Sequence, residues 1–150
     1  MQIRQPILYA SILLLVFVVV LVAMGGGLFN QSTPWPVQWQ HQSFNSLCHQ
    51  IADRSFWISG QPMAVCSRCM GIYSGFALGW VLLPMLSLMK ITRVAYIKKI
   101  VVFVLLFNLI DAAGNFFGLW QNTLVSRTVL GGMLGSSTAL IFIGDFFQHN

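Results

Sequence analysis

Residues that bind soft metal ions are concentrated in one stretch of this otherwise apolar chain. All three cysteines lie there beside one of the three histidines, as Cys48, His49, Cys66 and Cys69. Thiolate and imidazole are the usual protein ligands of zinc, and a C-x-x-C pair supplies two of four tetrahedral positions. The set therefore predicts a Cys₃His metal site that holds zinc. Asp53 follows His49 by about one helical turn and is a candidate to orient the imidazole.

The same residues leave two other interpretations open. Three cysteines are an odd number, so a purely structural disulfide framework would leave one thiol over. Cys66 and Cys69 could instead form a redox pair with Cys48 as a relay, or all three could be buried thiols without a ligand. Because Cys48 and His49 are adjacent, a helix would turn their side chains about 100° apart, which works against both reaching one ion.

The composition places these residues in a membrane protein. Of 150 residues, 57% are hydrophobic and 7% are charged, whereas soluble domains average about 25% charged residues. A helix needs roughly 20 apolar residues to cross a bilayer. We expect one all-α polytopic domain, residues 1–150, with four transmembrane helices at about 7–24, 69–89, 96–118 and 127–147. The +5 net charge does not indicate nucleic-acid binding, because the basic residues form no stripe.

The outer loop, residues 25–65, separates the first two of these helices. From Ser43 onward its apolar residues recur with helical spacing, which predicts a short amphipathic helix at about 44–57 on the membrane surface. The segment 7–24 lacks a cleavage site for a signal peptidase, so we expect it to be retained as a membrane helix. Gly71, Gly75 and Gly79 form a small-residue face that allows close helix packing, either within one chain or in a homo-oligomer.

Basic residues predict the orientation. With both termini in the cytoplasm, the cytoplasmic side carries five basic residues, namely Arg4, Lys90, Arg93, Lys98 and Lys99. The other side has only Arg54, Arg68 and Arg127, in agreement with the positive-inside rule. We therefore expect a multi-pass protein of the cell membrane with the cysteine site on the extracytoplasmic side.

The third helix carries a second polar group of residues. Asn108, Asp111, Asn115 and Asn122 recur at spacings that place them near one helix face. A carboxylate within a membrane helix is a functional candidate by default, with Arg68 or Arg127 as its partner. Asp111 could be a general base, a further metal ligand or half of a structural ion pair.

The three outer arginines suggest an anionic substrate. Arg54, Arg68 and Arg127 could bind a phosphate or carboxylate through paired hydrogen bonds. At the membrane surface, that anion would be a lipid headgroup or a lipid-linked phosphate. We expect Asp111, Arg68 and Arg127 to be catalytic, and Arg54, Asn115 and Asn122 to contact the bound substrate or cofactor.

Two families share parts of this pattern. A C-x-x-C pair at the outer end of the second helix resembles the quinone-dependent disulfide-forming enzymes, in which an arginine beyond the pair helps to hold the quinone. Here Arg68 lies inside the pair, and a second cysteine pair is absent from the sequence.

A longer resemblance covers roughly residues 44–135. Cys-His-Gln, Arg-Ser-Phe and Cys-x-Arg-Cys-x-Gly-Ile-Tyr-x-Gly are similar to a family of small membrane proteins classed as domain of unknown function 2085. The later part is similar as well, in Asp111, Asn115, Gly118, Asn122, Arg127, Gly131 and Gly135. Met70 departs from the family, which more often has a small hydroxyl residue there. The resemblance implies a membrane location and no particular reaction.

These observations give three functional expectations. The first is a zinc-dependent hydrolase or transferase that acts on an anionic lipid-linked substrate. The second is a quinone-linked thiol–disulfide oxidoreductase that uses Cys66 and Cys69. The third is a non-catalytic membrane subunit in which the metal only fastens the loop to the bundle.

Overall fold

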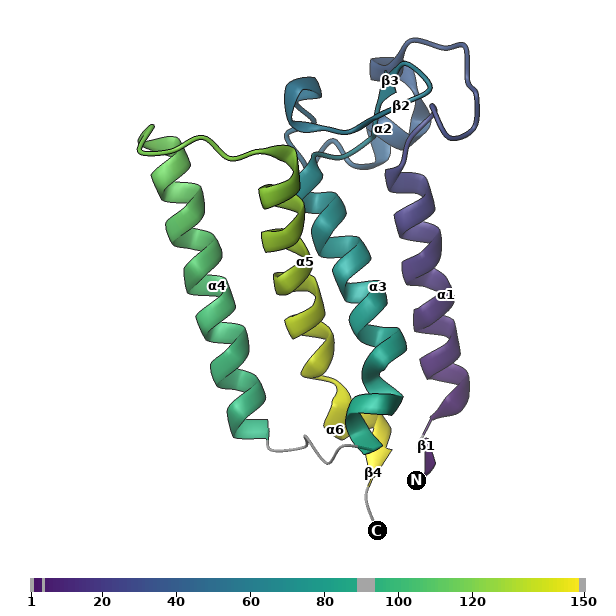
Figure 1. Cartoon of the computed structure of the whole chain (residues 1–150). Coiled ribbons are helices and arrows are strands. Elements are labelled where there is room, and N and C mark those ends of the chain that lie inside the picture. The colour runs from purple at the N-terminus through teal and green to yellow at the C-terminus, as the bar shows by residue number, and fades with distance from the viewer. Residues whose placement is uncertain (1, 4, 89–93, 149–150) are drawn as a thin grey trace.

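Four long helices form the body of the protein in a computed structural model that describes residues 2–3, 5–88 and 94–148 (Figure 1). They are α1 (Pro6–Ala23), α3 (Ser67–Leu88), α4 (Val94–Phe116) and α5 (Leu124–Leu140), followed by the single turn α6 (Ile143–Phe146). They run side by side, so that each end of the bundle collects one set of loops. The chain is thus mostly helical, as the composition predicts.

Three helical segments are long and apolar enough to cross a membrane within the described residues: Pro6–Ala23, Ser67–Ser87 and Leu124–Phe146. Helix α4 has a similar length of 23 residues, but it carries Lys98, Lys99 and Asp111. A fourth span through α4 therefore stays a prediction. Many large apolar side chains are exposed along α1 and α4, among them Leu14 at 68% and Phe103 at 69%. Such surfaces suit a lipid environment.

The two termini meet at one end of the bundle, opposite the cysteines. Strand β1 (Gln2–Ile3) pairs antiparallel with β4 (Phe147–Gln148). Above this pair, Tyr9 stacks on Trp80 with ring centroids 5.5 Å apart. The Tyr9 hydroxyl donates to the Trp80 carbonyl at 2.7 Å, which fixes α1 against α3. Both ends thus lie on one side, although Arg4, Lys90 and Arg93, on which the predicted orientation depends, lie outside the described residues.

Glycines set the closest helix contact, between α3 and α5. A Cβ atom on Gly71 would lie 2.2 Å from the Thr128 carbonyl oxygen, and one on Gly75 would lie 2.3 Å from that of Gly132. Gly79 meets the backbone of Ser136 in the same way. The small-residue face therefore packs against α5 within one chain, and a homo-oligomer through these glycines stays a prediction.

The outer end is closed by an irregular loop rather than by the predicted amphipathic helix. Between α1 and α3 the chain forms η1 (Trp35–Val37), α2 (Trp39–Ser43), η2 (Ala52–Arg54) and a hairpin of β2 (Trp57–Ile58) and β3 (Gln61–Pro62). Ser59 and Gly60 turn the hairpin with φ of 49° and 77°, the left-handed pair that a two-residue turn requires.

The helix prediction for residues 44–57 is wrong for a local reason. Gln50 has φ of 50°, a conformation that ends a right-handed helix. The apolar spacing arises because Phe44 and Cys48 point into the core, whereas Leu47 and Ile51 from the same predicted stripe are exposed.

The close packing of α3 and α5 gives a test of the fold. Gly75→Ala should destabilise the protein by about 1–3 kcal/mol, because the new methyl group meets backbone atoms that cannot move aside. Gly132→Ala is a matched control on the facing helix, since its Cβ would approach nothing closer than the Gly71 carbonyl at 3.7 Å. Thermal unfolding of the two detergent-solubilised variants measures the difference. Equal losses of stability would contradict the packing.

Candidate functional site

Two segments bring the cysteines together above α3. Cys48 follows the turn after α2, and Cys66 and Cys69 flank the first residues of α3. The connecting segment is held in place by backbone bonding, because the Ala64 amide donates to the Ala23 carbonyl at 3.1 Å. Gln50 adds a side-chain clamp, in which Nε2 donates to the carbonyls of Ala64 and His41. The loop is therefore tied to α1 and to the start of α3.

The three sulfur atoms form one cluster. Their Sγ atoms all lie within 4.8 Å of one another, and all three thiols are free. The Cys66 amide donates to the Cys48 sulfur at 3.2 Å. Hydrogen bonding to the side chain of Cys48, and then to that of Cys69, holds the pKa of Cys66 well below its usual range. These contacts favour Cys66 as a thiolate, the form in which cysteine binds metals and reacts.

The cluster faces a cavity of about 270 Å³, which we call the sulfur cavity. Its walls include the three cysteines together with Leu47, His49, Ile51, Arg54, Arg68, Ile72 and Arg127. His49 is exposed at this cavity and stands outside the group whose ligand atoms lie within 4.8 Å. The structure thus brings together three of the four predicted metal ligands.

The donor set fits zinc. Tetrahedral zinc–sulfur bonds of about 2.3 Å place two coordinated sulfurs about 3.8 Å apart. Three sulfurs that already lie within 4.8 Å of one another need only small side-chain rotations to reach that spacing. Three protein ligands beside an open cavity are also the arrangement of catalytic rather than structural zinc sites.

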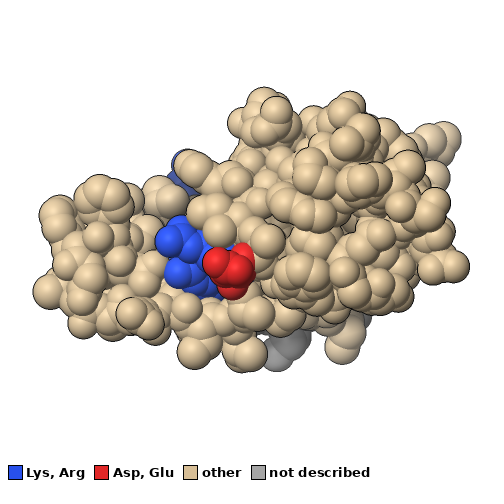
Figure 2. Space-filling model, turned by 90° about the horizontal axis from the view of Figure 1, so that it is seen from above, with Lys and Arg blue, Asp and Glu red and all other residues tan. Residues whose placement is uncertain are grey.

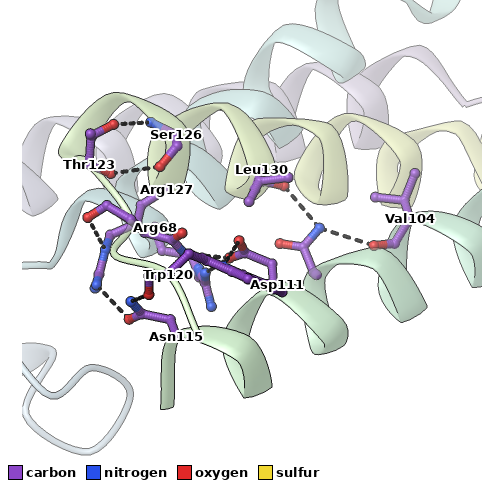
Figure 3. A network of polar contacts seen from close by, with 11 residues as sticks. Arg68, Val104, Asp111, Asn115, Trp120, Thr123, Ser126, Arg127 and Leu130 are labelled. Atoms are coloured by element: carbon purple, nitrogen blue, oxygen red, sulfur yellow. Dashed lines mark hydrogen bonds and ion pairs between the residues drawn. The ribbon is translucent and has the colours of Figure 1, made fainter. Parts of the chain in front are cut away.

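Asp111 lies at the centre of a polar network between α3, α4 and the connection to α5 (Figure 3). Its Oδ2 forms an ion pair with the Arg68 guanidinium and accepts a hydrogen bond from Asn122 at 2.6 Å. Its Oδ1 accepts from Trp120 Nε1 at 3.3 Å. With both oxygens occupied, Asp111 is held as the partner of Arg68, and the structure does not bring it into the sulfur group.

Arg127 is fixed by a parallel set of contacts. Its Nη2 donates to Asn115 Oδ1 at 2.9 Å, and its Nε to the Asn122 carbonyl at 3.4 Å. Asn115 in turn donates to the Trp120 carbonyl at 2.9 Å. The predicted polar face of the third helix thus positions two arginines. Asn108 lies deeper and donates to the Leu130 carbonyl, which joins α4 to α5.

A second cavity, the polar cavity, has a volume of about 560 Å³ and adjoins the first. It is lined by Asp53, Arg54, Asn115, Gly118, Trp120, Gln121, Asn122, Thr123, Leu124 and Arg127. Arg54 and Arg127 line both cavities. Seen from the outer end, basic residues and a carboxylate gather at one place on an otherwise uncharged surface (Figure 2).

Two positioning residues were not expected from the sequence. Gln50 belongs to the Cys-His-Gln triplet, yet neither its residue type nor its spacing predicts that its side chain hydrogen-bonds two backbone carbonyls of the loop. Trp120 covers Gly114, where a Cβ would lie 2.1 Å from its ring, and it bonds Asp111. In the sequence, the one indication of this contact is that a glycine, Gly114, lies close to a tryptophan, Trp120.

The fold and site define a helical membrane protein with a cysteine cluster at one end of its bundle. The chain belongs to the family described as predicted membrane protein (DUF2085), whose profile matches residues 48–141. It is 29% identical over 105 residues to the protein MJ1492 of Methanocaldococcus jannaschii, with 70% of this chain and 67% of that protein covered. The chain has no significant match among solved structures. The family assignment confirms the resemblance seen in the motifs.

The Arg68–Asp111 pair can be tested by comparing two aspartates. Asp111→Asn should lower stability by about 1–3 kcal/mol, because Arg68 is then left partly buried without a counter-charge; the two side chains are only 25% and 13% exposed. Asp53→Asn is the control, because Asp53 is exposed and pairs with no other described side chain. Denaturation of both variants, and of each combined with Arg68→Gln, measures the coupling. Additive effects of Asp111→Asn and Arg68→Gln would show that the pair contributes nothing.

Proposed function

We propose that this protein binds one zinc ion through Cys48, Cys66 and Cys69 and acts as a hydrolase or transferase on an anionic, lipid-linked substrate. The observation that supports this most is the convergence of three free thiols from two segments of the chain on one cavity. His49 lines the same cavity but stands outside the sulfur group, so the fourth position is left to water or substrate; a zinc ion that also bound His49 would be a structural one. We also propose that the site faces the extracytoplasmic side, as the basic residues of the sequence predict.

The surroundings of the sulfurs favour a catalytic over a purely structural ion. A structural zinc site is closed by four protein ligands, whereas this cluster opens into a cavity with three arginines in its walls. A zinc ion held there would supply Lewis-acid chemistry. The arginines would hold the negative charge of the substrate close to it.

Each polar residue then has a defined task. Arg54 and Arg127 bind the anion, since they line both cavities. Asn115 and Asn122 orient Arg127, and Asp111 orients Arg68 through the ion pair. In this proposal Asp111 is a positioning residue, so that of the three roles that the sequence left open the ion pair is preferred to the general base and the further metal ligand.

A redox function is the second candidate, and the position of Cys48 favours it. All three sulfurs lie close enough for Cys48 to exchange with a Cys66–Cys69 disulfide. The disulfide itself would form when the Cys66 and Cys69 thiols give two electrons and two protons to a quinone, which becomes the quinol; the exchange with Cys48 then moves the disulfide without net oxidation. Outside the cytoplasm, thiols encounter oxidising conditions.

A third candidate is a non-catalytic membrane subunit, in which the metal only fastens the loop to the bundle.

Elemental analysis of the purified protein separates these candidates. The wild-type protein should contain about one zinc per chain, and Cys48→Ser, Cys66→Ser and Cys69→Ser should each lose it, because each removes one thiolate ligand. His41→Gln is the control, since this histidine belongs to the same loop but is absent from the sulfur cavity. His49→Gln tests the fourth position.

The outcomes are distinct. Metal-free protein with a Cys66–Cys69 disulfide, detected by mass spectrometry without reductant, would reject zinc and support the oxidoreductase. Zinc-containing protein in which Arg54→Gln and Arg127→Gln leave cellular function intact would support the non-catalytic subunit.

A further inference from the structure

A third cavity lies on the membrane side of the site, in a groove between α1 and α5 on the surface of α3. Its volume is about 260 Å³, and it is lined by Leu15, Val16, Val19, Ile72, Tyr73, Phe76, Gly135 and Thr138. Nearly all of its surface is apolar. Helices α1 and α5 both pack on α3, and they flank it in Figure 1. We call this cavity the apolar groove.

The three cavities adjoin one another in a fixed order. Arg54 and Arg127 belong to both the polar cavity and the sulfur cavity. Ile72 belongs to both the sulfur cavity and the apolar groove. Ile72 and Phe76 follow Arg68 by one and two helical turns, about 6 and 12 Å along α3. The cysteine cluster therefore lies between a polar, basic compartment and a hydrocarbon-like one.

The basic compartment has unused hydrogen-bond donors. A guanidinium carries five N–H groups, and Arg54 donates none of them to another described residue, whereas Arg127 uses only its Nε and Nη2. The Nε of Arg68 is buried without a partner among the described groups. The partly buried carboxylate nearby, that of Asp111, is already paired. These donors suit an anion with several acceptor oxygens, such as a phosphate.

We propose that the three cavities form one binding site for a single amphiphile, a lipid whose phosphate headgroup lies against Arg54 and Arg127 and whose hydrocarbon chain lies in the apolar groove. This inference rests on the anionic, lipid-linked substrate of the proposed function and specifies how it is held. The groove, about 260 Å³ in volume, offers room for part of one hydrocarbon chain. The headgroup end of the lipid, rather than its chain end, faces the sulfur cluster.

Three probes that share parts of one structure test the two-part site. Lysophosphatidic acid carries a phosphate and one chain, monoacylglycerol carries the chain alone, and glycerol 3-phosphate carries the phosphate alone. Their dissociation constants are measured by native mass spectrometry on delipidated full-length protein in detergent. Lysophosphatidic acid should bind at least about tenfold more tightly than either partial probe, because only it gains both charge-assisted hydrogen bonds and apolar burial.

Variants then separate the two ends of the lipid. Arg54→Gln should weaken binding of lysophosphatidic acid by about tenfold through loss of a charged donor, and Val16→Phe or Leu15→Trp should do so by filling the groove. Lys98→Gln and Val18→Phe are matched controls: Lys98 is an exposed basic residue far from these cavities, and Val18 lies on the exposed face of α1. Thermal unfolding verifies that each variant is folded.

Three results would each overturn the inference. The first is equal binding of monoacylglycerol and lysophosphatidic acid, and the second is unchanged binding after both groove substitutions. The third is binding of glycerol 3-phosphate as tight as that of the lipid, which would reduce the site to a phosphate site without a chain.

Zinc measured on the same samples keeps this inference separate from the proposed metal site. Arg54→Gln and Val16→Phe should retain zinc, and Cys66→Ser should lose zinc but bind lysophosphatidic acid within about twofold of wild type, since the lipid contacts lie on other residues. If no sample contains zinc but the lipid pattern holds, only the metal proposal fails. If zinc is present and the lipid pattern is absent, only the lipid site fails.

Discussion

The outer end of the bundle depends on one charge pair, Arg68 with Asp111. In an apolar bundle neither charge is stable alone, so the arginine between the two cysteines of the C-x-x-C sequence is bound to a particular place on α4. That constraint fixes the rotation of the first turn of α3, which carries Cys66 and Cys69 toward the cavity. Trp120 and Asn122 complete the carboxylate's hydrogen bonds and thereby hold the α4–α5 connection over it. The sulfur cluster, the arginines and the polar cavity all follow from this arrangement.

The loop above the bundle places Cys48, which is distant in the sequence, beside Cys66 and Cys69. It contains few regular secondary-structure elements. Gln50, which has a left-handed backbone conformation, donates from its side-chain amide to the Ala64 backbone carbonyl. Gln38 accepts a hydrogen bond from the Gly26 backbone amide at 3.0 Å through its side-chain oxygen. Because both glutamines are nearly fully buried, their amides are protected from water. A polar scaffold of this kind can hold a cysteine in place without a long helix.

Features with strong, local sequence signals are predictable from the sequence. Apolar segments of membrane length predicted the helical class, and a C-x-x-C pair with a third cysteine predicted the cluster. Asp111 and its arginine partner were recognisable because a carboxylate among apolar residues requires a counter-charge. Spacing could not decide between the two arginines, since that choice depends on how α3 and α4 are rotated against each other. The helix predicted for the loop is absent, although Phe44, Cys48 and Ser55 are spaced like a helix face; the left-handed residue that interrupts the helix is a glutamine, Gln50, rather than a glycine. The glycine face showed that two helices meet closely, but only tertiary structure could assign α5 as the partner.

The central claim is that three sulfurs hold one metal ion at the outer end of the bundle. X-ray absorption spectroscopy at the zinc edge, on wild-type protein purified under reducing conditions, measures this most directly. We predict three sulfur neighbours at about 2.3 Å and one lighter neighbour at about 2.0 Å. A protein without zinc, or a zinc ion surrounded only by nitrogen and oxygen, would contradict it.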